Sequence, residues 1–329
     1  MQLYRHSGTM PLIGIPVVVV VGAIAAGILG FAYSFATVYC PVVYGNFLLT
    51  ALLGLGIGWA VAMGTRLGKI RNAYVAGTYG LAFGLVGLYV AWAADLIARI
   101  GGQGGPGWLE LAQVAFQPSV LWEYIQVFYD RGFWSISHHG QHADAVKGVF
   151  LVIVWLAEGG VILICSTACA FTLTASLPFC ERCNRWTVVE KAVRRLLPRG
   201  TRPDSAQRAM AGDVDALLDL LRASGDPYEY LQLDLASCPT CQESSYLSIQ
   251  FVRRTLDKKG KAQVSKTVVL KNLVLDPADI PRIRQAGRDP AEFPASPESP
   301  SLPVAGESPP ANQEPPQGKN AFFDFLDEK

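Results

Sequence analysis

Residues Gly148 to Cys183 read GVFLVIVWLAEGGVILICSTACAFTLTASLPFCERC, and this stretch decides the fold class of the chain. Its first 28 residues, to Ala175, carry a single charge, that of Glu158. About 20 predominantly apolar residues are enough for a helix that spans a bilayer. The stretch then ends in Cys180-x-x-Cys183, half of a metal-binding pattern. We therefore predict one helix that joins a membrane domain to a second domain on one side of the membrane.

Three further apolar stretches, residues 12–38, 44–63 and 73–97, are long enough to span a bilayer. Half of the 329 residues are hydrophobic and only 17% are charged, compared with about 25% in soluble proteins. We expect a membrane α-helical fold: a four-helix transmembrane domain at 1–175, with an outer interfacial loop at 98–147. Within that loop, residues 118–134 predict a helix at the membrane boundary, with Leu121, Trp122 and Tyr129 on its apolar face. The alternative is that this loop forms a lid over the bundle.

Small residues form stripes on two of the predicted spans. Gly54 and Gly58 stand four positions apart in the second span, and Gly77, Gly80 and Gly84 follow in the third. Such stripes allow close contact between helices. They fit either packing within the bundle or the contact face of a homo-oligomer.

The charged loops predict the orientation of the chain. The loop between the second and third spans carries Arg66, Lys69 and Arg71 with no acidic residue, and a further group of basic residues follows the fourth span. Basic loops face the cytoplasm. We expect a multi-pass protein of the cell (inner or plasma) membrane with both termini in the cytoplasm, and we expect no nucleic-acid partner because no motif for one is present.

Two CxxC pairs form the most specific motif of the chain: Cys180 with Cys183, and Cys238 with Cys241. Four thiolates are the ligand set of a tetrahedral structural zinc, and a reducing cytoplasm disfavours disulfides. The alternative is a pair of thiol redox sites. Through these cysteines and their hairpin setting, residues 176–288 resemble the general zinc-ribbon class. The 54 residues between the two pairs exceed the usual gap of that class.

We predict that this cytosolic α+β domain, residues 176–288, contains a helical insertion. Apolar residues at 189, 192, 193, 196 and 197 predict one helix, and a second helix is expected from Asp204 to Gly225. Alternating patterns then predict strands at 228–235, 246–256 and 262–275, followed by a short helix to about Ala286.

The last part of the chain, residues 289–329, is expected to be a disordered tail. Nine prolines fall between Asp289 and Gly318, a composition that cannot form a core. The final residues are different, because Phe322, Phe323 and Phe325 stand among acidic residues. We interpret them as a short docking peptide for a protein partner or for the basic surface of this chain.

Two further groups of residues are candidates for function. Glu158 lies near the middle of the fourth span, where an ionisable group costs about 3 kcal/mol unless it is paired or hydrated. Tyr79 and Thr50 are its candidate neighbours, and either proton or cation coupling or a structural hydrogen bond would explain it. The second group is His138, His139 and His142, a candidate metal site in the outer loop.

These features favour a non-enzymatic protein in the lipid bilayer. It would present a structural zinc module and a tail for the recruitment or regulation of a partner. No nucleotide-binding loop, catalytic triad or dinucleotide fingerprint is present. The alternatives are a small transporter or channel that uses Glu158, and a membrane metalloenzyme that uses the outer-loop histidines.

Overall fold

The computed structural model describes residues 2–39, 43–100, 113, 116–132, 146–200, 202, 204–223, 227–241, 243–256 and 261–287. The outer-loop histidines His138, His139 and His142 lie outside these residues. So do the tail and its Phe322, Phe323 and Phe325. The interpretations placed on these residues remain predictions.

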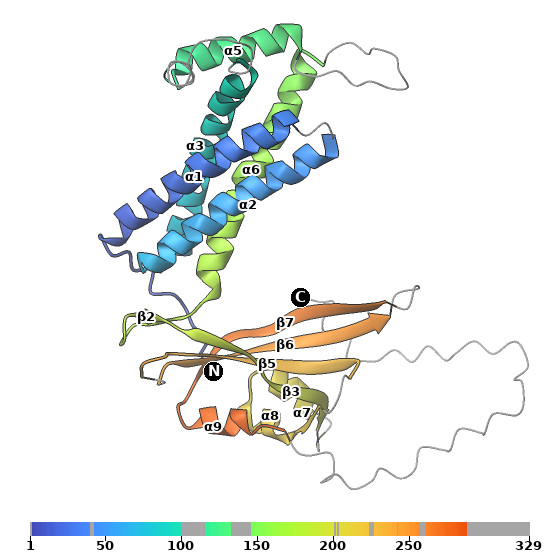
Figure 1. The fold of residues 1–329 in the computed structure, drawn as a ribbon. Coiled ribbons are helices and arrows are strands. Elements are labelled where there is room, and N and C mark those ends of the chain that lie inside the picture. Colours follow the sequence, from blue (N-terminus) through green and yellow to red (C-terminus); the bar gives the residue numbers. More distant parts are fainter. Residues whose placement is uncertain are drawn as a thin grey trace, which may run out of the picture. The chain divides into compact units, whose positions relative to one another are not determined.

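Four long helices form a bundle (Figure 1). They are α1 (Gly14–Tyr39), α2 (Val43–Leu67), α3 (Ala73–Ile100) and α6 (Val149–Ser176). Each is long and apolar enough to cross a membrane. Most of their ends lie within a few residues of those of the four predicted spans. The agreement is expected, because in a bilayer a single long apolar stretch can satisfy its backbone hydrogen bonds only as a helix. The bundle is held by a core that includes Val18, Ile57, Val61, Phe83 and Ile162.

Glycines let α6 approach its neighbours closely. A Cβ atom on Gly58 of α2 would stand 2.5 Å from the carbonyl oxygen of Ser166 in α6, and one on Gly54 would stand 2.6 Å from that of Ile162. On α3, a Cβ atom on Gly80 would meet the same Ser166 carbonyl at 2.6 Å. The glycine stripes therefore serve packing within the bundle.

The helix predicted in the outer loop is present as α5 (Pro118–Arg131). Val120 and Tyr124 lie against the end of α3 and Leu121 is buried, whereas Trp122 and Tyr129 are exposed. The packing partner is a neighbouring helix, which the periodicity of α5 alone does not reveal.

The second part of the chain is built on a five-stranded antiparallel sheet with the order β4-β3-β5-β6-β7 (Figure 1). Its strands are β3 (Val188–Gly200), β4 (Leu220–Arg222), β5 (Glu229–Ser237), β6 (Ser245–Leu256) and β7 (Ala262–Leu275). A small hairpin of β1 (Phe179–Cys180) and β2 (Arg185–Trp186) precedes it. The predicted strands correspond to β5, β6 and β7.

The central strand β5 is buried along nearly its whole length. Leu231, Leu233 and Leu235 share one face with Leu247 of β6. The short helices α7 (Ser205–Met210), α8 (Val214–Asp219) and α9 (Asp279–Arg284) pack near β3 and supply Leu217 and Ile283 to the core.

The helix predicted over residues 189–197 is wrong, because these residues form part of β3. The register shifts between Glu190, opposite Leu235, and Arg194, opposite Leu233. Four steps along β3 therefore match two along β5, a bulge that breaks the period of two. Ala192 takes a φ of 54° in this bulge. The irregular spacing of apolar residues imitates helical periodicity.

The single helix predicted from Asp204 to Gly225 is also corrected. The chain forms α7, α8 and then β4 over this range. Gly212, with a φ of 94°, lies between the two helices. Asp213 caps α8 by accepting hydrogen bonds from the backbone N–H groups of Asp215 and Ala216, at 3.0 and 3.2 Å. The helix cap at Asp213 therefore starts a second helix where the apolar periodicity predicted one continuous helix.

Candidate metal centre

Two tight turns carry the four cysteines. The first is the β1–β2 hairpin, in which Cys180 lies opposite Arg185 and Cys183 lies in the turn. Asn184 takes a left-handed φ of 51° there, a conformation that Asn tolerates better than most residues. The second turn connects β5 to β6 and holds Cys238 and Cys241. We call them the first and second knuckles.

The four sulfur atoms converge. The Sγ atoms of Cys180, Cys183, Cys238 and Cys241 all lie within 4.8 Å of one another, and those of Cys180 and Cys241 are 3.8 Å apart. A tetrahedral zinc with Zn–S bonds of about 2.3 Å separates its sulfurs by about 3.8 Å. All four thiols are free. This cluster, which the CxxC spacing predicted, can hold a metal ion.

The second knuckle favours thiolates. Burial opposes ionisation of Cys238, but the backbone N–H groups of Cys241 and Thr240 donate to its sulfur, and its pKa is lowered to about 6. The backbone N–H groups of Ser244 and Glu243 likewise lower the pKa of Cys241. Anionic sulfur is the form that binds metal, so this turn is prepared for a cation.

Cys183 of the first knuckle behaves in the opposite way. Its thiol donates a hydrogen bond to Cys241, which raises the pKa of Cys183 to about 12. Without a metal the cluster therefore keeps protons, because four neighbouring thiolates would repel one another. A bound divalent ion would displace these protons and neutralise the charge.

Side chains outside the cluster hold the two knuckles together. The hydroxyl of Ser244 lies 3.3 Å from the Cys180 sulfur. Arg182 of the first knuckle forms an ion pair with Glu243 beside the second. Groups that surround metal ligands in this way orient them.

The first knuckle is also attached to the helix bundle. Arg71, in the loop between α2 and α3, forms an ion pair with Glu181 and donates to the Asn184 side-chain oxygen at 2.9 Å. Its guanidinium carbon lies 4.0 Å from the centroid of the Phe179 ring. In addition, the indole N–H of Trp186 donates to the backbone oxygen of Arg66 at 2.8 Å. These contacts fix the position of the cluster at the ends of the helices.

Glu158 lies elsewhere, at a cavity inside the bundle. Asp95 of α3 and Tyr33 of α1 line the same cavity. Thr50, one of the two neighbours predicted for Glu158, instead forms a hydrogen bond with the Tyr33 hydroxyl at 3.1 Å, and Tyr79 is not among the lining residues. Asp95 was not predicted from the sequence, although its position four residues before Arg99, near the end of a predicted span, is visible there.

Comparisons with protein-family models, with curated proteins and with solved structures give no match to this chain. The structure itself suggests a class of protein. It has four helices long and apolar enough to suggest a multi-pass membrane protein, and a possible four-cysteine metal site beside a sheet.

Proposed function

We propose that this chain is a non-enzymatic protein of the cell membrane that holds a structural zinc module against the cytoplasmic ends of its helices and presents it to a protein partner. The convergence of four cysteine sulfurs within 4.8 Å carries the proposal. Zinc is the metal that best fits four thiolates in a small structural site. The two knuckles on hairpins of an antiparallel sheet favour a zinc-ribbon-like module.

Recruitment is favoured by the edge of the sheet. β7 is an edge strand that pairs with β6 on one side. Among the described residues, the backbone on its other side is paired only near its end, where Leu3 lies opposite Leu273. Along its earlier part, Val264 and Val268 are exposed, at 49% and 56%. An open edge with apolar side chains is a surface on which a partner strand can pair.

The experiment combines metal analysis with site-specific photo-crosslinking in the full-length protein. Wild-type protein purified in detergent should contain about one zinc per chain, as a four-thiolate site requires. Cys238→Ser should lose the metal. Cys165→Ser, which alters a cysteine of α6 away from the cluster, should keep it. A wild-type protein that folds without zinc, or that carries a disulfide among these cysteines, would refute the structural metal.

A photoreactive residue at position 268 reports on the partner in the native cells. We expect a specific adduct with another protein in the wild type and in Cys165→Ser, and its loss in Cys238→Ser. The same probe at the exposed Arg284 of α9 is the control position. Equal adducts at both positions, or an adduct that survives loss of zinc, would contradict recruitment by the module.

A further inference from the structure

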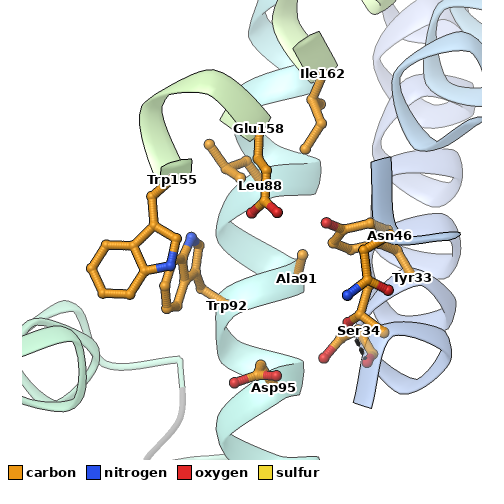
Figure 2. Close-up of a pocket in the computed structure, with 11 residues that line it drawn as sticks. Tyr33, Ser34, Asn46, Leu88, Ala91, Trp92, Asp95, Trp155, Glu158 and Ile162 are labelled. Carbon is orange, nitrogen blue, oxygen red and sulfur yellow. Dashed lines mark hydrogen bonds between the residues drawn. The ribbon is translucent and has the colours of Figure 1, made fainter. Parts of the chain in front are cut away.

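A cavity of about 100 Å³ with several polar groups in its wall lies within the four-helix bundle (Figure 2). Each of α1, α2, α3 and α6 contributes to its wall, through residues such as Tyr33, Asn46, Asp95 and Glu158. Figure 2 shows Glu158 on one side of the cavity and Asn46 and Tyr33 on the other. Ionisable and polar residues are rare among spanning helices, since they are costly there unless they have a role.

Two oxygen atoms at this cavity have no hydrogen-bond partner among the residues that the structure describes. Ser34 is 1% exposed, and its hydroxyl makes no hydrogen bond. The side-chain oxygen of Asn46 is buried and equally unsatisfied. Both residues line the cavity. A buried polar atom without a partner costs about 1–3 kcal/mol. These two oxygens therefore indicate a bound group that interacts with them.

The charges of the cavity do not balance. Asp95 is compensated, because Arg99 and the Tyr124 hydroxyl both donate to it at 2.9 Å. Glu158 forms no hydrogen bond or ion pair with any residue that the structure describes. When ionised, Glu158 leaves the cavity with one negative charge that no side chain of the described residues neutralises. The structural hydrogen bond to another helix, one of the two explanations for this residue, is not present in the described part of the chain.

Size and chemistry select the ligand. The cavity volume of about 100 Å³ is below the 300 Å³ or more of a pocket for a drug-sized organic ligand, so the cavity suits a small ligand with water. Carboxylate, amide and hydroxyl oxygens are ligands for hard metal cations. The single uncompensated charge matches a monovalent ion.

We propose that this cavity binds one small monovalent metal cation with its remaining water, through the oxygens of Glu158, Asn46 and Ser34. Trp92 and Trp155 form part of the wall, with ring centroids 5.0 Å apart. Their indole rings are therefore built-in reporters of the site. The proposal is independent of the zinc module.

The experiment is a titration of the full-length protein in detergent with NaCl, KCl and LiCl. Ionic strength is kept constant with N-methylglucamine chloride, whose cation is too large for the cavity. We expect a saturable change in tryptophan emission with at least one alkali ion, and the same ion should raise the temperature of unfolding. The ion that acts at the lowest concentration identifies the preferred cation.

Variants test the assigned oxygens. Glu158→Gln should weaken the apparent affinity about tenfold or more, since it removes the charge. Asn46→Ala and Ser34→Ala should weaken it by smaller factors. Glu123→Gln, on the exposed surface of α5, is the matched control and should leave the affinity unchanged. The absence of a saturable effect on both emission and unfolding, for all three ions, would overturn the proposal. An affinity that Glu158→Gln leaves unchanged would overturn it equally.

Discussion

Arg71 is the residue that connects the metal cluster to the bundle. Its side chain is 10% exposed, whereas that of Arg182, which forms the other ion pair of the first knuckle, is 71% exposed. The two arginines thus offer the same chemistry in two environments. Hydrogen bonds to charged groups contribute about 1.5–3 kcal/mol when they are protected, and exposed ion pairs contribute about 1 kcal/mol or less.

We predict that Arg71→Ala destabilises the first knuckle by about 1–3 kcal/mol, because Glu181 and Asn184 lose their donor and the Phe179 ring loses its cover. Hydrogen exchange at the amides of Phe179 and Cys180 measures this effect, and exchange should become faster. Arg182→Ala is the control and should change exchange little. Equal effects of the two substitutions would contradict the larger contribution assigned to the buried Arg71.

Individual functional residues can be predicted from the sequence when they belong to a short motif with a fixed spacing. The four cysteines were predicted because each CxxC turn is a local pattern, and the structure brings them together. Arg71 entered the sequence analysis only as a positive charge for orientation. Its contact with Glu181 and Asn184 joins positions more than 100 residues apart. Asp95 likewise accepts a hydrogen bond from the Tyr124 hydroxyl on another helix, a contact that local spacing does not predict.

Among the elements, the spans and strands β5 to β7 followed from the sequence, and β3 did not. Period-two alternation is clear in a strand without bulges. In β3 the bulge is stabilised by a neighbour, since the Asp234 side chain accepts a hydrogen bond from the Ala192 backbone N–H at 2.7 Å. That partner belongs to β5, so no reading of residues 188–200 alone exposes it.

Helix packing yields a prediction about α2 and α6. Gly58→Ala places a methyl group 2.5 Å from the Ser166 carbonyl oxygen. We expect a loss of about 1–3 kcal/mol in stability, as is typical of overpacking. Gly160→Ala in α6 is the matched control, because nothing lies within 4 Å of its added Cβ atom. Thermal unfolding of both variants in detergent measures the difference, and similar unfolding temperatures would contradict the assigned packing.

In the molecule as a whole, three segments meet on one side of the bundle. The N-terminal segment pairs with β7, since Tyr4 N–H donates to the Asn272 oxygen and Val274 N–H donates to the Gln2 oxygen, both at 2.9 Å. The loop that contains Arg71 meets the first knuckle. The N-terminal segment and the sheet therefore lie at the same end of the bundle. The four candidate spans found among the described residues are consistent with this, because an even number of crossings returns the chain to the side on which it began.

The charges of the loops predict on which side of the membrane the sheet lies. Arg66, Lys69 and Arg71 favour the cytoplasm for the loop after α2. A reporter enzyme fused after Lys69 should therefore report the cytoplasm, and one fused after Gly132, beyond α5, should report the outside. A fusion after Gln285, which follows all four candidate spans, should agree with the fusion after Lys69. The reverse pattern would place Cys180 and its partners in an oxidising compartment, where disulfides form, and would remove the physical basis of the zinc assignment.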